Sequence, residues 1–426
     1  MISATQTSYA ETECTREELF AKQVKCAYKN SSYWREIILD SGINMDNIRI
    51  SDLSAFPVME KADIEKYNSE MQCCSDSEIS EIFCTSGTTS QPVIIPLTEN
   101  DLNRLAEAEN LSIKRTGATE KDLFQICTTL DKQFMAGIAY YLGIRKIGSG
   151  VIRTGINSVS VQWQTIMKLR PSYLIAVPSF IVKMLLYAEK EGIDVNQTSV
   201  RKIICIGENI RNSAFNDNPL ASFISERWNV NLYSTYAATE MATSFTECEV
   251  QSGGHLNSDH LILEVLDDNN SRVSPGCIGE LVITTLGVEG MPLFRYRTGD
   301  IVFIKMGLCP CGSSEPRVSP VIGRVKQRLK YKGTTIYPSA ICTVLDAEKL
   351  LDDYLILVEN DNFGNDSIRL VVPEGSNISA KKIMNLLRET VRVSIPVEKC
   401  GQMASIKRRF NLLGLRKPRK VIDLRN

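Results

Sequence analysis

The segment between Phe83 and Pro92 concentrates small and hydroxylated residues that could bind a phosphate group. Its hydroxyl donors are Thr85, Ser86, Thr88, Thr89 and Ser90. Gly87 lets the backbone approach a ligand closely, and each hydroxyl can donate a hydrogen bond to a phosphate oxygen. The segment lacks the Gly-Lys-Ser/Thr of a Walker loop, so an ordinary hairpin loop is an equal interpretation from this segment alone.

A second group of residues could bind a metal ion. Cys309 and Cys311 form a Cys-Pro-Cys pair, and Cys248 and His255 lie seven residues apart upstream. Three thiolates and one imidazole make a closed tetrahedral set, which is typical of structural zinc. We predict a zinc site that stabilises residues 248–311 without taking part in chemistry. Free thiols are the alternative, because the chain contains 13 cysteines.

The hydrophobic pattern predicts that an α/β fold with additional β layers positions these groups. Short apolar runs that suit buried strands alternate with helical segments such as residues 179–191. The predicted strands span residues 79–83, 93–97, 123–127, 172–177, 200–206 and 231–233. Residues 1–75 are predicted to be helical. Residues 260–305 show an alternating β pattern, which would place His260 in a strand.

Local signals predict a helix start and a domain boundary. Thr98 followed by Asp101 has the form of a capping box, which indicates a helix after the hydroxyl-rich loop. The last hundred residues or so are predicted as β–α–β–β–α with a basic end. A chain of 426 residues exceeds what one core usually supports, and we place the boundary near Lys326, between domains 1–325 and 326–426.

Composition argues against several classes of protein. The 49 basic and 50 acidic residues give a net charge of −1, which argues against nucleic-acid binding. Residues 1–20 lack the apolar region of a secretory signal, and no apolar run approaches the length of a membrane span. The odd number of cysteines, 13, indicates reduced thiols, so we expect a cytoplasmic protein. The oligomeric state stays open, and a homodimer is one option.

Further motifs follow the loop in a fixed order. They are Ile206-Gly-Glu208, Tyr236-Ala-Ala-Thr-Glu240, Tyr296-Arg-Thr-Gly-Asp300, and Gly323-Arg324 with Gly333. Together with the loop, this series resembles the adenylate-forming superfamily of acyl-CoA ligases, in particular its short phenylacetate–CoA ligase-like branch. The resemblance implies a large N-terminal adenylate-forming domain and a small mobile α+β C-terminal domain.

The resemblance also implies that the loop binds the β- and γ-phosphates of ATP. The residues concerned are Thr85, Ser86, Gly87, Thr88 and Thr89. Gly207 and Glu208 would lie beside the adenine, with the backbone making the contacts. For this pair, an ordinary turn between a strand and a helix is the alternative. The family usually has a glycine and a lysine before the proline, where this chain has Ser90 and Gln91.

By the same resemblance, Tyr236 would stack on the adenine, Thr239 would contact the α-phosphate, and Glu240 would ligate Mg²⁺. Asp300 would end a turn and accept both ribose hydroxyls, and Arg324 would add positive charge. Without the resemblance, the first turn of an apolar helix is the alternative for Glu240. The chain has only two histidines, so such a reaction would depend on positioning and charge, not on a His-dependent triad.

The C-terminal domain of this superfamily rotates between two half-reactions, and the resemblance places the pivot at Lys326. An exposed strand lysine is the alternative for this residue. Alignment on residues 421–423 makes Lys417 the adenylation lysine, with Lys420 as the second candidate. A lysine serves there as a point charge. Arg416 replaces the usual glycine.

The resemblance therefore predicts an ATP-dependent carboxylate–CoA ligase that uses ATP, Mg²⁺ and coenzyme A. The expected substrate is an aryl acid or another small flat carboxylic acid, bound by residues drawn from 133–141 and 233–238. Two alternatives stay open. One is an adenylating enzyme that loads a carrier protein or an amine. The other is a degenerate nucleotide-binding protein without turnover, which the substitutions at Ser90, Gln91, Ala237 and Arg416 would suit.

Overall fold

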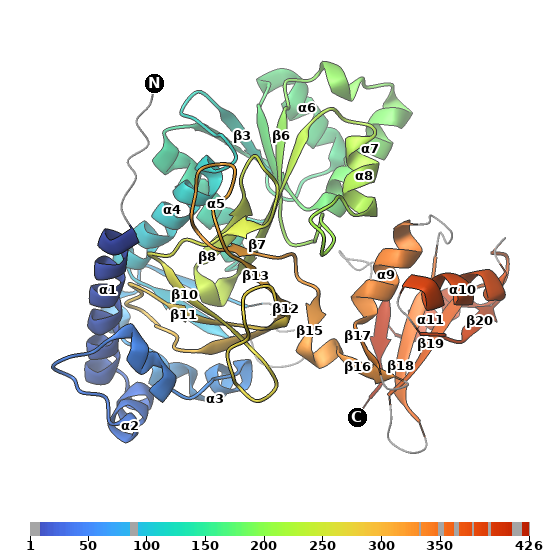
Figure 1. The fold of residues 1–426 in the computed structure, drawn as a ribbon. Helices are drawn as coiled ribbons and strands as arrows, with labels where there is room; N and C mark the ends of the chain where they lie inside the picture. Colours follow the sequence, from blue (N-terminus) through green and yellow to red (C-terminus); the bar gives the residue numbers. More distant parts are fainter. Residues whose placement is uncertain are drawn as a thin grey trace.

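A computed structural model describes residues 9–85, 93–331, 334–347, 353–361, 366–376, 379–390, 393–410 and 420–425. The loop residues Ser86 to Gln91, together with Gly333 and Lys417, lie outside the described residues. Figure 1 shows a large N-terminal part, built from sheets and surrounding helices, and a smaller C-terminal unit that follows β15. None of the described helices is long and apolar enough to cross a membrane.

A nine-stranded sheet forms the centre of the N-terminal part, with the strand order β13-β14-β9-β8-β7-β6-β5-β3-β4. Its strands are β3 (Leu123–Ile126), β4 (Gly150–Arg153), β5 (Tyr173–Ala176), β6 (Lys202–Cys205), β7 (Asn231–Ala238), β8 (Thr243–Glu247), β9 (Gly254–His255), β13 (Ile304–Lys305) and β14 (Arg317–Val318). Strands β3 to β7 pair in parallel, whereas β8, β9, β14 and β13 pair antiparallel. This arrangement confirms the predicted combination of an α/β layer with further β structure.

Helices cover both faces of the parallel strands. They are α4 (Glu99–Lys114), α5 (Met135–Ile147), α6 (Val159–Leu169), α7 (Pro178–Glu191) and α8 (Pro219–Ser225), with a 3-10 turn, η3, at Val195–Gln197. Leu174 of β5 packs with α6, α7 and α8, whereas its neighbours Tyr173 and Ile175 pack with α4 and α5. The predicted capping box is confirmed, because Thr98 and Asp101 accept hydrogen bonds from each other's backbone at the start of α4.

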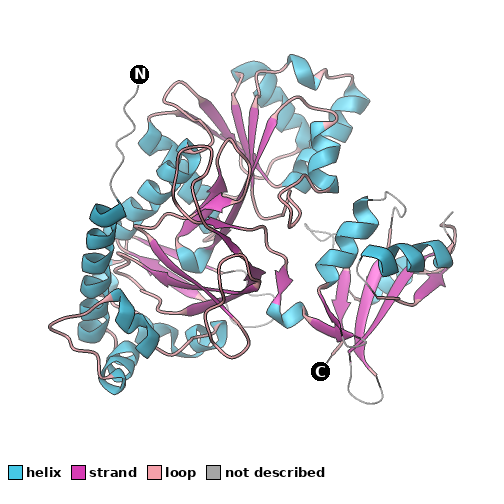
Figure 2. Ribbon diagram, in the orientation of Figure 1, coloured by secondary structure: helices cyan, strands magenta, loops and turns pink. Residues whose placement is uncertain are grey.

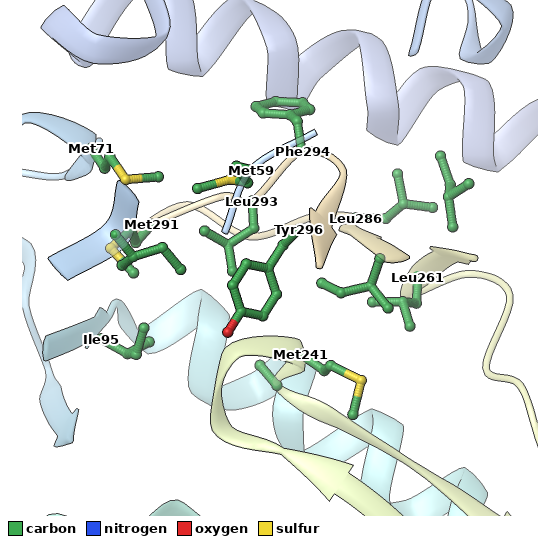
Figure 3. Packing of buried hydrophobic residues seen from close by; sticks show 14 of the residues in the cluster. Met59, Met71, Ile95, Met241, Leu261, Leu286, Met291, Leu293, Phe294 and Tyr296 are labelled. Atoms are coloured by element: carbon green, nitrogen blue, oxygen red, sulfur yellow. The ribbon is translucent and has the colours of Figure 1, made fainter. Parts of the chain in front are cut away.

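A second, four-stranded sheet packs with the N-terminal helices around the largest hydrophobic cluster. It contains β10 (Leu261–Leu266), β11 (Gly279–Thr285), β12 (Tyr296–Val302) and β15 (Gly323–Arg324). The other elements here are the hairpin of β1 (Glu81–Cys84) and β2 (Ile94–Leu97), α1 (Tyr9–Asn30), α2 (Ser32–Ser41), α3 (Lys61–Met71), and the 3-10 turns η1 (Ile50–Ala55) and η2 (Asp76–Glu78). Figure 3 shows this packing around Phe294 and Tyr296.

The C-terminal unit has its own hydrophobic cluster, formed by residues between 329 and 421. Its elements are β16 (Leu329–Tyr331), β17 (Thr334–Ile336), α9 (Pro338–Ala347), β18 (Leu355–Asn360), β19 (Asp366–Pro373), α10 (Ala380–Thr390), β20 (Val397–Cys400), α11 (Met403–Arg409) and β21 (Val421–Asp423). Figure 2 shows this unit set apart from the strands of the N-terminal part. The predicted β–α–β–β–α order corresponds to β17 through α10, and it misses β16, β20, α11 and β21, which are short.

Three local predictions are wrong. Glu240 lies in a single 3-10 turn that is followed by β8, not by an apolar helix. All five residues of β8 are buried, so the segment shows no strand alternation by which it could be recognised. Asp300 lies within β12 and does not end a turn, although the preceding Gly299 adopts a left-handed conformation with φ of 76°. His260 lies in the turn before β10.

Candidate active site

The tight connection between β7 and β8 carries two of the predicted site residues. Tyr236 lies near the end of β7, and Thr239 and Glu240 follow in the 3-10 turn η4 (Thr239–Met241). Ala242 closes this turn in the left-handed region, with φ of 46°, and its backbone donates to the Thr239 carbonyl. The strand and turn therefore hold Glu240 at the carboxyl end of the parallel strands, where sheets of this kind bind ligands.

Asp300 brings three predicted residues together. Oδ2 accepts a hydrogen bond of 2.7 Å from the Tyr236 hydroxyl, and Oδ1 accepts one of 2.9 Å from Nε of Arg324. Arg324 is in β15, directly opposite Asp300 in the antiparallel pairing of β12 with β15. Burial, and then the Asp300 carboxylate, raises the pKa of Tyr236, so its phenol keeps the proton that it donates. The Tyr236 ring also stacks on Phe245, with a centroid distance of 5.8 Å.

Glu240 accepts a hydrogen bond from a residue for which we predicted no role from the sequence. The Tyr296 hydroxyl donates to Oε1 of Glu240 over 3.2 Å. Figure 3 shows the Tyr296 ring inside the apolar cluster, with its oxygen directed toward the turn that carries Met241. Burial, and then Glu240, raises the pKa of Tyr296. The tyrosine is visible in the motif, but nothing in the sequence indicates that it reaches Glu240.

Gly207 and Glu208 lie directly after β6, as predicted. Gly207 adopts φ of 72°, which favours glycine. The Glu208 carboxylate accepts hydrogen bonds of 2.9 Å from both the backbone nitrogen and the hydroxyl of Ser179 at the start of α7. Its side chain is thus occupied by the helix terminus.

Thr85 forms the base of the hydroxyl-rich loop. Its backbone nitrogen donates to the Val93 carbonyl over 3.0 Å, and its hydroxyl oxygen accepts from the Val93 nitrogen over 3.2 Å. The two predicted flanking strands are present as β1 and β2, and they pair antiparallel. Thr85 is the one residue predicted to bind the β- and γ-phosphates that the structure describes, and it holds the two sides of the loop together.

The predicted pivot, Lys326, is exposed in the 3-10 turn η5 (Val325–Gln327) between β15 and the C-terminal unit. The Arg425 guanidinium donates to the carbonyls of Lys326 and Arg328 over 2.9 Å and 3.1 Å. Sequence reasoning missed Arg425, since no pattern near the end of the chain points to this contact. Lys420, the second candidate for the adenylation lysine, immediately precedes β21, and its side chain contacts Asp346.

The predicted zinc ligands Cys248, His255, Cys309 and Cys311 come together, with their ligand atoms all within 4.8 Å of one another. The sulfur atoms of Cys248 and Cys309 are 3.8 Å apart, and Sγ of Cys311 lies 3.7 Å from Nε2 of His255. Zinc–sulfur bonds of about 2.3 Å in a tetrahedron place two sulfur atoms about 3.8 Å apart. The geometry of the group therefore fits a zinc ion.

The electrostatics of this group also fit a cation. Burial, with Arg115 and Arg317 nearby, lowers the pKa of His255 to about 3, so the imidazole is in the neutral form that binds metals. Burial raises the pKa of Cys248 to about 12, so this buried thiol becomes a thiolate only when a cation compensates its charge. Nδ1 of His255 is buried without a hydrogen-bond partner in the described part of the chain, and Nε2 faces the sulfur atoms.

Comparison with known proteins identifies the group to which the chain is similar. The AMP-binding enzyme family matches residues 12–290. A phenylacetate–coenzyme A ligase of Aromatoleum evansii is 26% identical over 420 residues, which cover 94% of this chain and 92% of the relative. A phenylacetate–coenzyme A ligase of Pseudomonas putida is 28% identical, and the match covers 82% of this chain and 79% of the relative.

The fold is also similar to that of 2-hydroxyisobutyryl-CoA ligase. In its postadenylation state that enzyme matches with a TM-score of 0.82 and 19% identity, over 98% of this chain and 90% of the other. In its thioesterification state the TM-score is 0.70 with 20% identity, over 99% of this chain and 91% of the other. The chain belongs to the AMP-binding enzyme family, within its phenylacetate–CoA ligase-like branch.

Proposed function

We propose that the protein activates a carboxylic acid with ATP and transfers the acyl group to coenzyme A. The main support is that Tyr236, Asp300 and Arg324, which come from three separate motifs, meet in one hydrogen-bonded group. The phenylacetate–coenzyme A ligases that match most of the chain support the acceptor. In the first step an oxygen of the acid attacks the α-phosphorus and pyrophosphate leaves. In the second, the thiol sulfur of coenzyme A attacks the acyl carbon and AMP leaves.

Each residue of the site has a role in this reaction. Asp300 accepts the ribose hydroxyls, the Tyr236 ring stacks on the adenine, and Thr239 contacts the α-phosphate. Glu240 offers a carboxylate to Mg²⁺, which when bound neutralises phosphate charge. No step requires a strong base, because preorganised donors and charges suffice for phosphoryl chemistry of this kind. Lys417 would supply the charge between the carboxylate and the α-phosphate.

The acid is an aryl or another small flat acid in this proposal. Phe134, at the start of α5, exposes 36% of its surface, which is unusual for a large aromatic side chain beside a hydrophobic core. The turn before it holds Lys132 and Gln133 with φ of 60° and 55°, and the Cys84 nitrogen of β1 donates to the Gln133 carbonyl. Strained turns of non-glycine residues cluster at ligand sites.

The proposal includes two domains that meet at Lys326, spanning residues 1–325 and 326–426. The separate hydrophobic cluster of the C-terminal unit supports this division. The match to 2-hydroxyisobutyryl-CoA ligase gives different TM-scores, 0.82 and 0.70, for two states of that one enzyme, which supports a unit that changes orientation. The pivot residues would absorb the change in φ and ψ.

Two further parts of the proposal concern the metal and the compartment. A structural zinc ion held by Cys248, His255, Cys309 and Cys311 would fix the antiparallel edge of the nine-stranded sheet, at the end of β8 that lies away from the β7–β8 connection. The cytoplasm supplies both ATP and coenzyme A and keeps the cysteines reduced.

Acid-dependent exchange of labelled pyrophosphate into ATP, measured with a panel of aryl and short-chain acids, tests the function. Exchange with one acid class, followed by release of the CoA thioester when coenzyme A is added, is the expected result. Exchange without thioester formation would favour an enzyme that loads a carrier protein or an amine. ATP binding without exchange for any acid would favour a degenerate nucleotide-binding protein.

A further inference from the structure

In two motifs of the site, each tyrosine hydroxyl donates a hydrogen bond to the acidic residue of the other motif. In each motif, a tyrosine precedes an acidic residue by four positions: Tyr236 precedes Glu240, and Tyr296 precedes Asp300. Neither tyrosine bonds the carboxylate of its own motif in the structure. The Tyr236 hydroxyl donates to Asp300 over 2.7 Å, and the Tyr296 hydroxyl donates to Glu240 over 3.2 Å. Each carboxylate is therefore oriented by the other motif.

No strand pairing otherwise fixes the distance between these two carboxylates. Glu240 follows β7 of the nine-stranded sheet, whereas Asp300 lies in β12 of the four-stranded sheet. The packing of the two sheets in one hydrophobic cluster sets their overall placement, and side-chain bonds between them refine the relative position of the two acidic groups. The two tyrosine hydrogen bonds are of this kind. The Tyr236 bond is donated from the nine-stranded sheet to the four-stranded sheet, and the Tyr296 bond is donated from the four-stranded sheet to the turn after β7.

Both donors are held in place by their surroundings. Tyr296 is 3% exposed within the largest hydrophobic cluster, and the neighbouring Arg297 nitrogen donates to the Met59 carbonyl over 2.8 Å. The Tyr236 ring lies against Phe245, which is 1% exposed, at an interplanar angle of 17°. A hydroxyl on a fixed ring restricts the rotation of its carboxylate more than water would.

The bonds leave acceptor sites for ligands. A carboxylate oxygen has two lone pairs, so Oδ2 of Asp300 can accept from Tyr236 and from a ribose hydroxyl at the same time. No described residue donates to Oε2 of Glu240, so this oxygen stays available to a cation. A hydroxyl bound to one oxygen therefore orients each carboxylate without blocking it.

We propose that Tyr236 and Tyr296 are positioning residues that act crosswise: Tyr236 sets the ribose contact of Asp300, and Tyr296 sets the cation contact of Glu240. This inference rests on the proposed use of ATP and Mg²⁺ at this site. Hydrogen bonds to a charged group contribute about 1.5–3 kcal/mol, which corresponds to a change of roughly 10- to 100-fold in the interaction that each bond supports.

The test uses Tyr236→Phe and Tyr296→Phe in the full chain, since each change removes one oxygen atom and keeps the ring. Calorimetric binding of ATP and 2′-deoxy-ATP is measured across a range of Mg²⁺ concentrations, so the readout does not depend on turnover. We expect Tyr236→Phe to weaken the binding of ATP about tenfold and the binding of 2′-deoxy-ATP much less, so that the variant discriminates less between the two riboses. The Mg²⁺ dependence of binding should stay unchanged. We expect Tyr296→Phe to raise the Mg²⁺ concentration required for ATP binding about tenfold. The discrimination between ATP and 2′-deoxy-ATP should stay unchanged.

Tyr173→Phe is the matched control, because it removes a buried hydroxyl that donates to the Thr116 carbonyl over 3.1 Å, away from both carboxylates. If all three variants lose thermal stability but keep wild-type discrimination and Mg²⁺ dependence, the hydroxyls serve only folding and the proposal fails. It also fails if the wild-type chain does not distinguish the two nucleotides. Nucleotide binding with the expected crosswise pattern, but without exchange for any acid, would uphold this inference while contradicting the proposed ligase activity.

Discussion

The ammonium nitrogen of Lys420 lies 2.6 Å from Oδ1 of Asp346 and 4.5 Å from the centroid of the Tyr354 ring. The Tyr354 hydroxyl donates to the same carboxylate oxygen over 2.7 Å. Lys420 is therefore bound within the C-terminal unit, between α9 and the strand that begins with Leu355. A lysine held in this way is poorly suited to bridge a carboxylate and a phosphate in the N-terminal part.

We therefore predict opposite effects for the two candidate lysines. Lys417→Ala should lower acid-dependent pyrophosphate exchange by about 100-fold or more, because it removes a charge that stabilises the transition state. Lys420→Met should leave exchange within about threefold. It should lower the free energy of unfolding by about 1 kcal/mol through the loss of a partly exposed ion pair and a cation–π contact. Exchange assays and urea titrations of both variants check this, and strong loss of exchange in Lys420→Met alone would reverse the assignment.

The grouping of Cys248, His255, Cys309 and Cys311 could be predicted from the sequence, but the crosswise hydrogen bonds of Tyr236 and Tyr296 could not. Cys309 and Cys311 form a recognisable Cys-Pro-Cys pattern, and the group is completed by Cys248 and by His255, one of only two histidines in the chain. Tyr236 and Asp300 lie 64 residues apart on strands of different sheets. Their contact depends on how the two sheets pack, and no local periodicity records that packing.

Among the strands, too, some could be predicted from the sequence and others could not. The parallel strands could be predicted because each is a short apolar run between helices, as β5 and β6 are. The segment Thr243–Glu247 was misread because every residue of it is buried, and its strand character comes from pairing with β7 and β9. Arg425 illustrates a third case, since it donates to the backbone carbonyls of Lys326 and Arg328, and backbone carbonyls carry no sequence signature.

An ion pair across the hinge should influence the balance of the two half-reactions. The proposed rotation about Lys326 would carry its own carbonyl along with the residues that follow. The bonds from Arg425 to the carbonyls of Lys326 and Arg328 would therefore survive this rotation. The pair between Arg328 and Asp268 spans 2.6 Å and joins the C-terminal side of the proposed pivot to the loop after β10, so the rotation would break it.

We predict that Asp268→Asn destabilises the orientation seen here relative to the rotated one. Because Asp268 is 68% exposed, the pair contributes less than about 1 kcal/mol, and the ratio of pyrophosphate exchange to thioester formation should fall about two- to fourfold. Glu359→Gln is the control, since it breaks the partly exposed pair with Arg369 inside the C-terminal unit. An equal effect of both variants, or none for Asp268→Asn, would exclude this role.

Removal of the metal should destabilise the fold while sparing the chemistry of molecules that remain folded. We expect about one zinc ion per chain by elemental analysis, and a fall of at least 5 °C or so in the melting temperature after treatment with a chelator. Cys309→Ser should lose the metal, whereas Cys277→Ser, which changes an exposed cysteine outside the group, should keep it. A chain purified without metal that melts at the same temperature with and without zinc would contradict the prediction.

Glu109 should make the stability of the protein depend on pH. This residue of α4 is 2% exposed, and burial raises its pKa to about 7, although the Ser244 hydroxyl donates to it. Folding keeps its proton up to about pH 7, whereas the unfolded chain loses it near pH 4.5. Between these values the unfolded state binds fewer protons, so the free energy of unfolding falls as the pH rises through this window.

Glu109→Gln should therefore lose less stability than the wild type between pH 5 and pH 8, because the amide stays neutral. The difference should reach the order of 2 kcal/mol, or a few degrees in melting temperature. Thermal unfolding at both pH values checks this, with Glu99→Gln as a control that changes an exposed carboxylate on the same helix. Melting temperatures of the wild type and Glu109→Gln that fall in parallel would mean that Glu109 does not titrate in this range, and that the buried hydroxyl of Ser244 stabilises its charged form.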